Sequence, residues 1–329
     1  MQRGTRREFL KGAATTALVS ATIRPAGAQK PAESTRFVDT AALHIGYEEN
    51  GNASGFPVIL LHGFPDDVRA FDGVIPPLAA AGHRTLVPYL RGYGPTRFRT
   101  ADAPRMAQQA AIGQDVIDFA DALKLKQFAV VGYDWGGRAA AIAAALNRDR
   151  IRAAVLIGGY TIQNTLNPGP PGSPAAEQRA WYQWYFNTER GRAGLQANRR
   201  ALCRYLWETW SPTWRFTDAT YDRTAASFDN PDFVDVVIHS YRHRHGNAPG
   251  EPRFKEMEAQ LAKRPPIAAP TITLYGADDG VGGSPAEATP AERAVLPALA
   301  AHRLIAGAGH FLPREKPEAV SSAVLELLR

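Results

Sequence analysis

The stretch that decides the fold is FAVVGYDWGGR, which runs from Phe128 to Arg138. Four apolar or small residues with β propensity run from Phe128 into Gly132, and the alanine-rich segment that continues to Leu146 is compatible with a helix. Gly132 and Gly136 flank Asp134 two positions before and two positions after it. A sharp strand-to-helix turn strains its central residue and excludes bulk at such flanking positions, so the central side chain projects above the sheet edge. We therefore predict such a turn with Asp134 at its tip.

Asp134 stands where most enzymes with this turn have a serine, and the difference directs the chemistry. A carboxylate that attacks an ester would form an anhydride, which is an unpromising intermediate. A carboxylate that attacks a saturated carbon bearing a leaving group forms an alkyl ester of the enzyme instead. Water, a general base and an oxyanion hole can then hydrolyse this ester. Asp134 thus points to epoxides or alkyl halides, unless it is simply a surface aspartate in a glycine-rich turn.

Length and composition allow one large α/β domain or two ordinary ones, because 329 residues with 45% hydrophobic content can build a substantial core. The formal net charge is +6, but residues 1–28 hold five basic and one acidic side chain, a net of +4 that leaves about +2 for the rest. This small excess predicts no nucleic-acid partner. The single cysteine, Cys203, excludes an intrachain disulfide and offers no metal cluster, and we expect neither a metal nor another cofactor.

The amino terminus has the pattern of a targeting segment. The sequence TRREFLK at residues 5–11 precedes a weakly apolar stretch, residues 12–23, and then Ala-Gly-Ala at residues 26–28. This arrangement resembles a bacterial twin-arginine export signal. It implies transport of the folded protein by the twin-arginine machinery, a mature chain that starts near Gln29, and a periplasmic or secreted enzyme. About 12 apolar residues are too few to span a bilayer, which needs about 20, so no stable membrane anchor is expected.

Strand and helix patterns alternate through the first half of the chain. The predicted strands are Arg36–Val38, His44–Glu48, Val58–Leu61, Arg84–Val87, Phe128–Gly132 and Ala153–Ile157, with a helix at Met106–Leu123. The strand pattern resumes at Thr271–Tyr275 and His302–Ile305, and a final helix runs from about Pro317 to Leu328. This alternation predicts an α/β fold with a mostly parallel, doubly wound sheet whose site lies at the carboxyl ends of the strands.

The alternation stops between about Tyr160 and Pro266, where the sequence is aromatic and helix-rich with prolines at both ends. We interpret this segment as a helical cap inserted into the core. The predicted regions are therefore a signal peptide at 1–28, the first part of the core at 29–159, the cap at 160–266 and the second part of the core at 267–329. Aromatic side chains of the cap are expected to line an apolar pocket, although most of them would belong to its core.

The loop after the strand Val58–Leu61 is a candidate for the oxyanion hole. It reads His62-Gly63-Phe64-Pro65, and a loop with glycine and proline after a buried strand can present a backbone N–H to a developing oxyanion. We assign the two donors to the backbone amides of Phe64 and Trp135. His62 lies at the end of the strand and not opposite the turn, so we expect it to be structural.

The acid and the base are predicted in two loops near the carboxyl end. Residues 276–280 read Gly-Ala-Asp-Asp-Gly, and a spacing of three from the first glycine favours Asp279 over Asp278 as the carboxylate that orients a histidine. Residues 307–312 form a glycine-containing loop that presents His310, which we choose as the base. The order Asp134, Asp279, His310 matches the nucleophile, acid and base order of α/β-hydrolases.

Four motifs together carry a specific resemblance: GYDWGG, HGFP, GADD and GAGHFLP. From about Arg36 to the carboxyl end, the chain resembles the epoxide hydrolase branch of the α/β-hydrolase fold. The resemblance implies that two cap tyrosines hold the epoxide oxygen. Tyr182 begins a segment similar to the family's Tyr-Gln-x-Tyr-Phe, and Tyr241 precedes arginine as in its second segment, although Ser240 stands where an aromatic residue is common. Tyr185 is the alternative to Tyr182.

The chemistry agrees with two tyrosines, because a phenol with a pKa of about 10 is protonated at neutral pH and can donate to the oxygen of an opening ring. Further residues expected in the substrate pocket are Trp184, Tyr185 and Phe311. The sequence thus predicts an exported enzyme that opens a small apolar epoxide through an ester on Asp134. His310, oriented by Asp279, would then activate water to release a vicinal diol.

Two other functions remain open. Haloalkane dehalogenases share the Asp-Trp pair, and Trp135 could donate its indole N–H to a halide, although their loop commonly has a polar residue at the place of Phe64. A fluoroacetate-type dehalogenase is expected to have arginine where this chain has Trp135. A catalytically inactive hydrolase-fold binding protein is the weaker alternative, because a complete set of nucleophile, acid and base is present in the sequence.

Overall fold

The computed structural model describes residues 35–329, which contain a nine-stranded sheet. The proposed export signal at residues 1–28 lies outside the described residues. The strands are β1 (Arg36–Asp39), β2 (Leu43–Gly51), β3 (Pro57–Leu61), β4 (Arg84–Pro88), β5 (Arg97–Phe98), β6 (Phe128–Tyr133), β7 (Ile151–Ile157), β8 (Thr271–Gly276) and β9 (Leu299–Ile305). Their order is β1-β2-β4-β3-β6-β7-β8-β9, with β5 paired to β2. The pairs formed by β2 are antiparallel, and β3, β4 and β6 to β9 pair in parallel, which confirms the predicted sheet.

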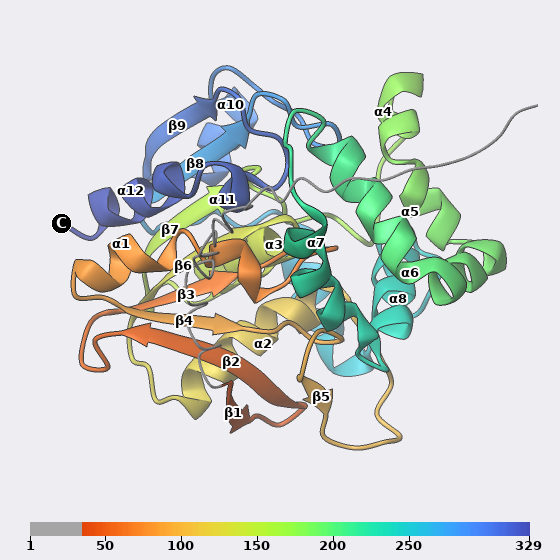
Figure 1. Ribbon diagram of the computed structural model, residues 1–329, viewed down its shortest axis with the longest axis horizontal. Helices are drawn as coiled ribbons and strands as arrows, with labels where there is room; N and C mark the ends of the chain where they lie inside the picture. Colours follow the sequence, from red (N-terminus) through yellow and green to blue (C-terminus); the bar gives the residue numbers. More distant parts are fainter. Residues whose placement is uncertain (1–34) are drawn as a thin grey trace, which may run out of the picture. The chain divides into compact units, whose positions relative to one another are not determined.

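Two pairs of helices flank this sheet (Figure 1). One pair is α1 (Ile75–Ala80) with α12 (Pro317–Leu327), and the other is α2 (Gln109–Ala122) with α3 (Asp134–Leu146). The helix α2 begins three residues after the predicted start at Met106, because Gln108 still has an extended backbone. Gly113 lets α2 approach α3 closely, since a Cβ there would collide with the side chain of Ile142.

Between β7 and β8, the elements that the structure describes are all helical. They are α4 (Pro174–Arg179), α5 (Trp181–Phe186), α6 (Glu189–Trp210), α7 (Asp218–Ala225), α8 (Phe233–Arg244) and α9 (Lys255–Leu261), with short 3-10 turns at Ala226–Asp229 and Pro252–Phe254. In Figure 1, α4, α5, α6 and α8 gather on one side of the sheet. We call the segment 160–266 the cap. The remaining helices are α10 (Pro290–Val295), α11 (Leu312–Glu315) and a 3-10 turn at Val68–Phe71.

A buried carboxylate joins the cap to the core. The side chain of Glu258, in α9, is only 3% exposed, and it accepts hydrogen bonds from the side chain of Gln109 (3.0 Å), the backbone N–H of Ala110 (3.1 Å) and the hydroxyl of Thr165 (2.9 Å). A buried carboxylate is tolerated when several donors satisfy it in this way. Glu258 thereby links α9 and the entrance of the cap to the first turn of α2. Within residues 35–329, no helix combines the length and the apolar character needed to cross a bilayer.

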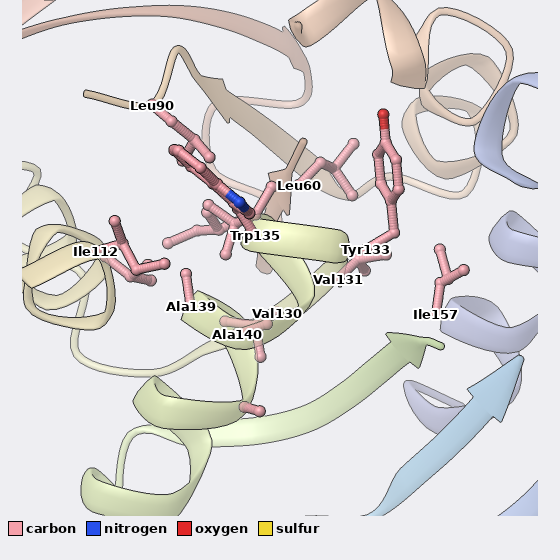
Figure 2. Close-up of a cluster of buried hydrophobic side chains, with 14 of the residues drawn as sticks. Leu60, Leu90, Ile112, Val130, Val131, Tyr133, Trp135, Ala139, Ala140 and Ile157 are labelled. Carbon is pink, nitrogen blue, oxygen red and sulfur yellow. The ribbon is translucent and has the colours of Figure 1, made fainter. Parts of the chain in front are cut away.

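The core around the turn at Asp134 is close-packed. All six residues of β6 are buried, and the alanines from Ala139 to Ala145 on α3 are at most 4% exposed. Figure 2 shows Trp135 beside Leu90 on one side of the turn and Tyr133 on the other side. Small side chains on α3 let the helix lie close to the sheet, so this packing fixes the position of the turn that carries Asp134.

Candidate active site

Asp134 lies at the junction of β6 and α3 with a φ of +51°, in the left-handed region that non-glycine residues rarely adopt. The flanking glycines are needed because a Cβ on Gly132 would collide with the carbonyl of Gly136, and a Cβ on Gly136 would collide with the carbonyl of Leu61. A Cβ on Gly63 would come within 2.5 Å of the Cβ of Asp134. These contacts confirm the predicted strained turn and its requirement for small neighbours.

The carboxylate of Asp134 is held by the loop after β3. The backbone N–H of Phe64 donates to Oδ1 of Asp134 at 2.7 Å. Burial alone would raise the pKa of Asp134, but the hydrogen bond and charge of His310 and the backbone amides of Phe64 and Trp135 lower it below its ordinary value. The two amides that the sequence suggested as oxyanion donors therefore both act on this carboxylate, which is ionised at neutral pH.

His310 connects Asp134 to Asp279. Its Nδ1 lies 3.0 Å from Oδ2 of Asp279, and its Nε2 lies 3.7 Å from Oδ2 of Asp134. The other oxygen of Asp279 accepts from the backbone N–H groups of Val281 (2.9 Å) and Gly282 (2.8 Å), so the carboxylate is fixed in position. Asp278 instead accepts a hydrogen bond from the hydroxyl of Thr213. The structure thus places Asp279, and not Asp278, beside the histidine.

The charges of these three residues are strongly coupled. Burial lowers the pKa of His310, but the carboxylates of Asp279 and Asp134 outweigh burial and raise this pKa to about 10. Burial raises the pKa of Asp279, and the charge and hydrogen bond of His310 reverse this effect and lower it. At neutral pH the site therefore holds an imidazolium between two carboxylates.

The loop that carries His310 is anchored by residues that the sequence did not suggest. The backbone N–H of His310 donates to the carbonyl of Trp210 at the end of α6 (3.2 Å). Glu315 accepts from the backbone N–H of Gly309 (2.8 Å) and from the hydroxyl of Ser211 (2.7 Å). Trp210 and Ser211 belong to the cap, so the cap helps to position the histidine of the core. A sequence motif could not reveal this contact because the two loops lie about 100 residues apart.

The two tyrosines suggested by the resemblance come together in the cap. Tyr182 on α5 and Tyr241 on α8 are at most 3% exposed, and their rings are perpendicular with centroids 5.4 Å apart. Burial, together with the charge of Asp134, raises the pKa of Tyr182 to about 12 and that of Tyr241 well above its ordinary value. Gln183 donates to the hydroxyl of Tyr182 at 3.2 Å, whereas the hydroxyl of Tyr241 has no hydrogen-bond partner among residues 35–329. Both phenols are therefore protonated near Asp134.

Three residues expected in the pocket lie elsewhere. Trp184 is 44% exposed and donates its indole N–H to Glu177 at 2.7 Å, so it belongs to the cap surface. The hydroxyl of Tyr185 points toward α6, where a Cβ on Gly194 would collide with it. Phe311 is fully buried and packs against Trp207, Trp210 and Trp214, so it supports the histidine loop from behind. These residues neighbour Tyr182 and His310 in the sequence, but their side chains point in other directions.

His62 makes two backbone contacts that fix its ring. Its Nε2 accepts from the N–H of Leu90 at 3.1 Å, and its Nδ1 lies 3.1 Å from the carbonyl oxygen of Gly63. Burial lowers the pKa of His62 to about 4, so the ring is neutral. This placement agrees with the structural role predicted from its position at the end of the strand.

A cavity of about 120 Å³ opens beside Asp134. Its polar lining includes Asp134, Asp279, His310, Arg138 and Thr161. Arg138 was not among the predicted site residues, although it is a lone charged residue at the start of the alanine-rich part of the helix, four positions after Asp134. Residues at this spacing share one helix face. Among residues 35–329, no group of His, Cys, Asp and Glu side chains is arranged to hold a metal ion.

Comparisons with known proteins agree with this geometry. The family model for the α/β hydrolase fold matches residues 57–317. The chain is similar to epoxide hydrolase B of Mycobacterium tuberculosis, with 25% identity over 87% of this chain and 95% of that protein. It is also similar to a haloalkane dehalogenase of Psychrobacter cryohalolentis, with 26% identity over 88% of this chain and 89% of that protein. The solved structure of a putative epoxide hydrolase from Klebsiella pneumoniae is 41% identical, with a TM-score of 0.85 over 89% of this chain and 96% of that one.

Proposed function

The chain belongs to the α/β-hydrolase fold family, and from this premise we propose that it is an epoxide hydrolase that forms an alkyl ester on Asp134. The observation that carries the proposal is the position of the ionised Asp134 carboxylate, with one oxygen on the Phe64 amide and the other facing His310. Similarity to proteins named epoxide hydrolases, over most of their lengths, supports it further.

The first step uses the oxygen that the loop does not hold. Oδ1 of Asp134 is engaged by Phe64, so Oδ2 attacks an oxirane carbon, one carbon–oxygen bond of the ring breaks, and the ester forms. The ring oxygen leaves with negative charge, which Tyr182 and Tyr241 stabilise by donating to it. Oδ1 becomes the carbonyl oxygen of the ester and already lies at the backbone N–H that will serve as its oxyanion hole.

The second step follows from the change in charge. The ester carries no charge, so His310 loses one of the two carboxylates that raise its pKa. The imidazolium therefore gives its proton to the alkoxide that formed from the ring oxygen. Neutral His310, oriented by Asp279, takes a proton from water as the water attacks Cγ of Asp134. The tetrahedral oxyanion forms at Oδ1 beside the amides of Phe64 and Trp135. Its collapse breaks the bond between Cγ and Oδ2, and the leaving oxygen takes the proton held by His310 to give the diol. The acid formed at Asp134 then returns its proton to His310, which restores the carboxylate.

A second candidate is a hydrolytic haloalkane dehalogenase with the same nucleophile, base and acid. It is favoured by the indole N–H of Trp135, which is buried and has no hydrogen-bond partner among residues 35–329 and could therefore donate to a departing halide. The ring of Phe64 stacks on Trp135, with centroids 5.7 Å apart, and offers no second polar donor. This arrangement supports the epoxide over the halide.

Parallel assays separate the two activities. Purified enzyme and Asp134→Asn are incubated with a panel of about twenty epoxides and haloalkanes that includes styrene oxide and 1-bromobutane, and diol and bromide are measured. We expect diol from wild type alone and no bromide. Bromide release without diol would assign the dehalogenase activity instead, and no product from any substrate would favour the binding protein.

Export is a separate proposal that rests on residues 1–28. We propose that the precursor uses the twin-arginine route and that the enzyme works in the periplasm or outside the cell. Changing Arg6 and Arg7 together to lysine should leave the precursor in the cytoplasm with its specific activity intact. Continued secretion of the double variant would refute this assignment.

A further inference from the structure

Buried polar atoms without a hydrogen-bond partner are concentrated around Asp134. Seven side chains among residues 35–329 carry such atoms, and five of them belong to this region: Trp135, Thr161, Tyr241, Arg244 and His310. Unpaired buried polar groups are costly, so a cluster of them indicates a place where a ligand supplies the missing partners. The proposed mechanism assigns roles to His310, to the hydroxyl of Tyr241 and to the backbone amide of Trp135. It leaves Thr161 and Arg244 without a role.

Arg138 adds a positive charge to the same region. It lines the cavity beside Asp134 and is only 8% exposed. Its Nε donates to the carbonyl of Thr161 at 2.9 Å, which orients the guanidinium, and no other hydrogen bond of this side chain is found among residues 35–329. Two of its nitrogens therefore remain for a ligand.

Arg244 lies on the cap side of the site. Its side chain is 9% exposed, and its Cζ lies 4.7 Å from the centre of the Tyr241 ring, an arrangement typical of a cation–π contact. Its Nε and Nη2 have no hydrogen-bond partner within the described part of the chain. Burial and the neighbouring charge of Arg244 lower the pKa of Arg138 to about 9, so the two guanidinium groups repel each other.

Other deeply buried arginines of this protein are paired with carboxylates. Arg91 donates from Nε and Nη2 to Asp115 at 2.7 and 2.6 Å, and Arg314 makes the same two-pronged contact with Asp66. Neither Arg138 nor Arg244 forms an ion pair with any residue in the range 35–329. A buried guanidinium that no carboxylate contacts directly is disfavoured, so an anion from outside the chain would supply the missing contact.

The charge balance indicates an anion with a single charge. The four charged side chains that line the cavity are Asp134, Asp279, Arg138 and His310, and with the imidazole protonated they sum to zero. Arg244 adds one positive charge that a single carboxylate would neutralise. A guanidinium also matches the planar, two-oxygen geometry of a carboxylate.

We propose that the substrate is an epoxide bearing a carboxylate, which Arg138 binds with Arg244 as the second cationic group. This proposal rests on the epoxide hydrolase assignment and replaces the small apolar epoxide expected from the sequence. Arg138 follows Asp134 by one helical turn on the same face, and helical side chains point back toward the amino terminus of the helix. The carboxylate therefore lies within a few bonds of the carbon that Asp134 attacks, as in an oxirane-2-carboxylate.

The test compares 3-phenyloxirane-2-carboxylate with the corresponding carboxamide, which has nearly the same shape and no charge. We expect wild type to prefer the carboxylate in kcat/KM. Arg138→Gln and Arg244→Gln should each lower kcat/KM for the carboxylate by at least about 30-fold, since a buried charge pair contributes strongly to binding. Turnover of the carboxamide should fall much less than turnover of the carboxylate. Arg192→Gln, which removes a cap arginine paired with Asp235 on the surface, is the matched control.

Two outcomes would overturn the proposal: equal use of both substrates by wild type, or an equal loss for both substrates in the arginine variants. The second result would mean that the arginines only hold Tyr241 in place. A third arm uses 2-bromo-3-phenylpropanoate. Bromide release that depends on Arg138, without any epoxide turnover, would retain the carboxylate site and reject the epoxide hydrolase assignment.

A binding measurement keeps the proposal testable if a variant does not fold. Wild-type enzyme is titrated calorimetrically with phenylacetate and with phenylacetamide, its neutral match. We expect the carboxylate to bind at least about 30-fold more tightly than the amide, by the same charge-pair argument. Equal affinities for the two compounds would contradict the carboxylate site.

Discussion

Two buried arginine regions of this protein differ in how their charge is satisfied. Around Arg314, Asp66 accepts from Nε at 2.8 Å and also from Nη2 and the hydroxyl of Tyr133. Burial lowers the pKa of Arg314, but Asp66 and Asp67 reverse this effect and raise it above its ordinary value. Around Arg138, burial and Arg244 lower the pKa to about 9. The pKa values of two arginine side chains that are both largely buried are thus shifted in opposite directions.

The two regions show the difference between buried charged groups that stabilise the fold and buried charged groups that bind a ligand. In the Arg314 region the chain provides every counter-charge itself, and this network supports Tyr133, the residue directly before Asp134. In the Arg138 region the partners are left for a substrate. Satisfied buried networks stabilise the fold, whereas unsatisfied ones reduce stability and are retained where they act on a ligand. Changes in the first region should therefore affect folding, and changes in the second should affect catalysis or binding.

The largest effect on catalysis is expected for His310→Gln. Asp134 can still open the ring, but nothing activates the water, so ester hydrolysis should slow by about 100- to 10,000-fold and the ester should accumulate. Mass spectrometry of the substrate-treated variant should find an adduct on the peptide that contains Asp134, with Asp134→Asn as the control. A folded variant with an unmodified peptide would mean that the roles are misassigned.

The largest effect on stability is expected for Arg314→Met. This change leaves Asp66 buried without its counter-charge, which should lower the free energy of unfolding by about 3–5 kcal/mol. Urea unfolding followed by circular dichroism measures the loss. A loss below about 1 kcal/mol would show that the ion pair of Arg314 and Asp66 does not stabilise the fold as proposed.

The cap tyrosines test whether the site stabilises oxygen charge. Tyr182→Phe and Tyr241→Phe each remove one donor, and if each acts like a donor of an oxyanion hole, the alkylation step should slow by about a hundredfold, or roughly 3 kcal/mol. Single-turnover kinetics with an epoxide measure this step, with Tyr185→Phe as the matched control because its hydroxyl faces α6. Near wild-type rates in the double variant would remove the epoxide assignment, and a large effect only at Tyr185 would move the donor there.

The smallest effect on the free energy of unfolding is expected for Arg138→Met, in contrast to Arg314→Met. Arg138→Met removes a buried cation that forms no direct ion pair among residues 35–329, so the free energy of unfolding should stay within about 1 kcal/mol of wild type or increase. The same urea measurement applies, beside Arg314→Met. A loss as large as that of Arg314→Met would mean that the chain itself satisfies Arg138, and it would remove the argument for a bound carboxylate.

The sequence predicted those parts of the site that follow from local rules. Glycines on both sides of Asp134 determine the turn, and the spacing within two glycine-containing loops after predicted strands selected Asp279 and His310. The resemblance favoured Tyr182 over Tyr185, and in the structure Tyr182 and Phe186 share the buried face of α5 while Tyr185 points to α6.

The sequence could not predict contacts that depend on how the cap meets the core. Arg138 and Arg244 are 106 positions apart and approach each other because Tyr241 on α8 packs against Trp135, the residue after Asp134. For the same reason the anchoring of the His310 loop by Trp210 and Ser211 was not visible. Trp184 looked like a pocket residue, but its indole turns to Glu177 on the surface. Such orientations depend on tertiary packing and not on local pattern.

The ester intermediate on Asp134 is tested most directly by the position of the water oxygen after the first turnover. Enzyme in excess of 3-phenyloxirane-2-carboxylate, or of styrene oxide for comparison, reacts once in water enriched in oxygen-18, and both the diol and the Asp134 peptide are analysed by mass spectrometry. Because Asp134 supplies the oxygen that joins the substrate and water attacks Cγ of the ester, we expect the heavy oxygen in the Asp134 peptide and an unlabelled diol. Heavy oxygen in the diol with an unlabelled Asp134 would show direct attack of water on the epoxide and contradict the ester mechanism.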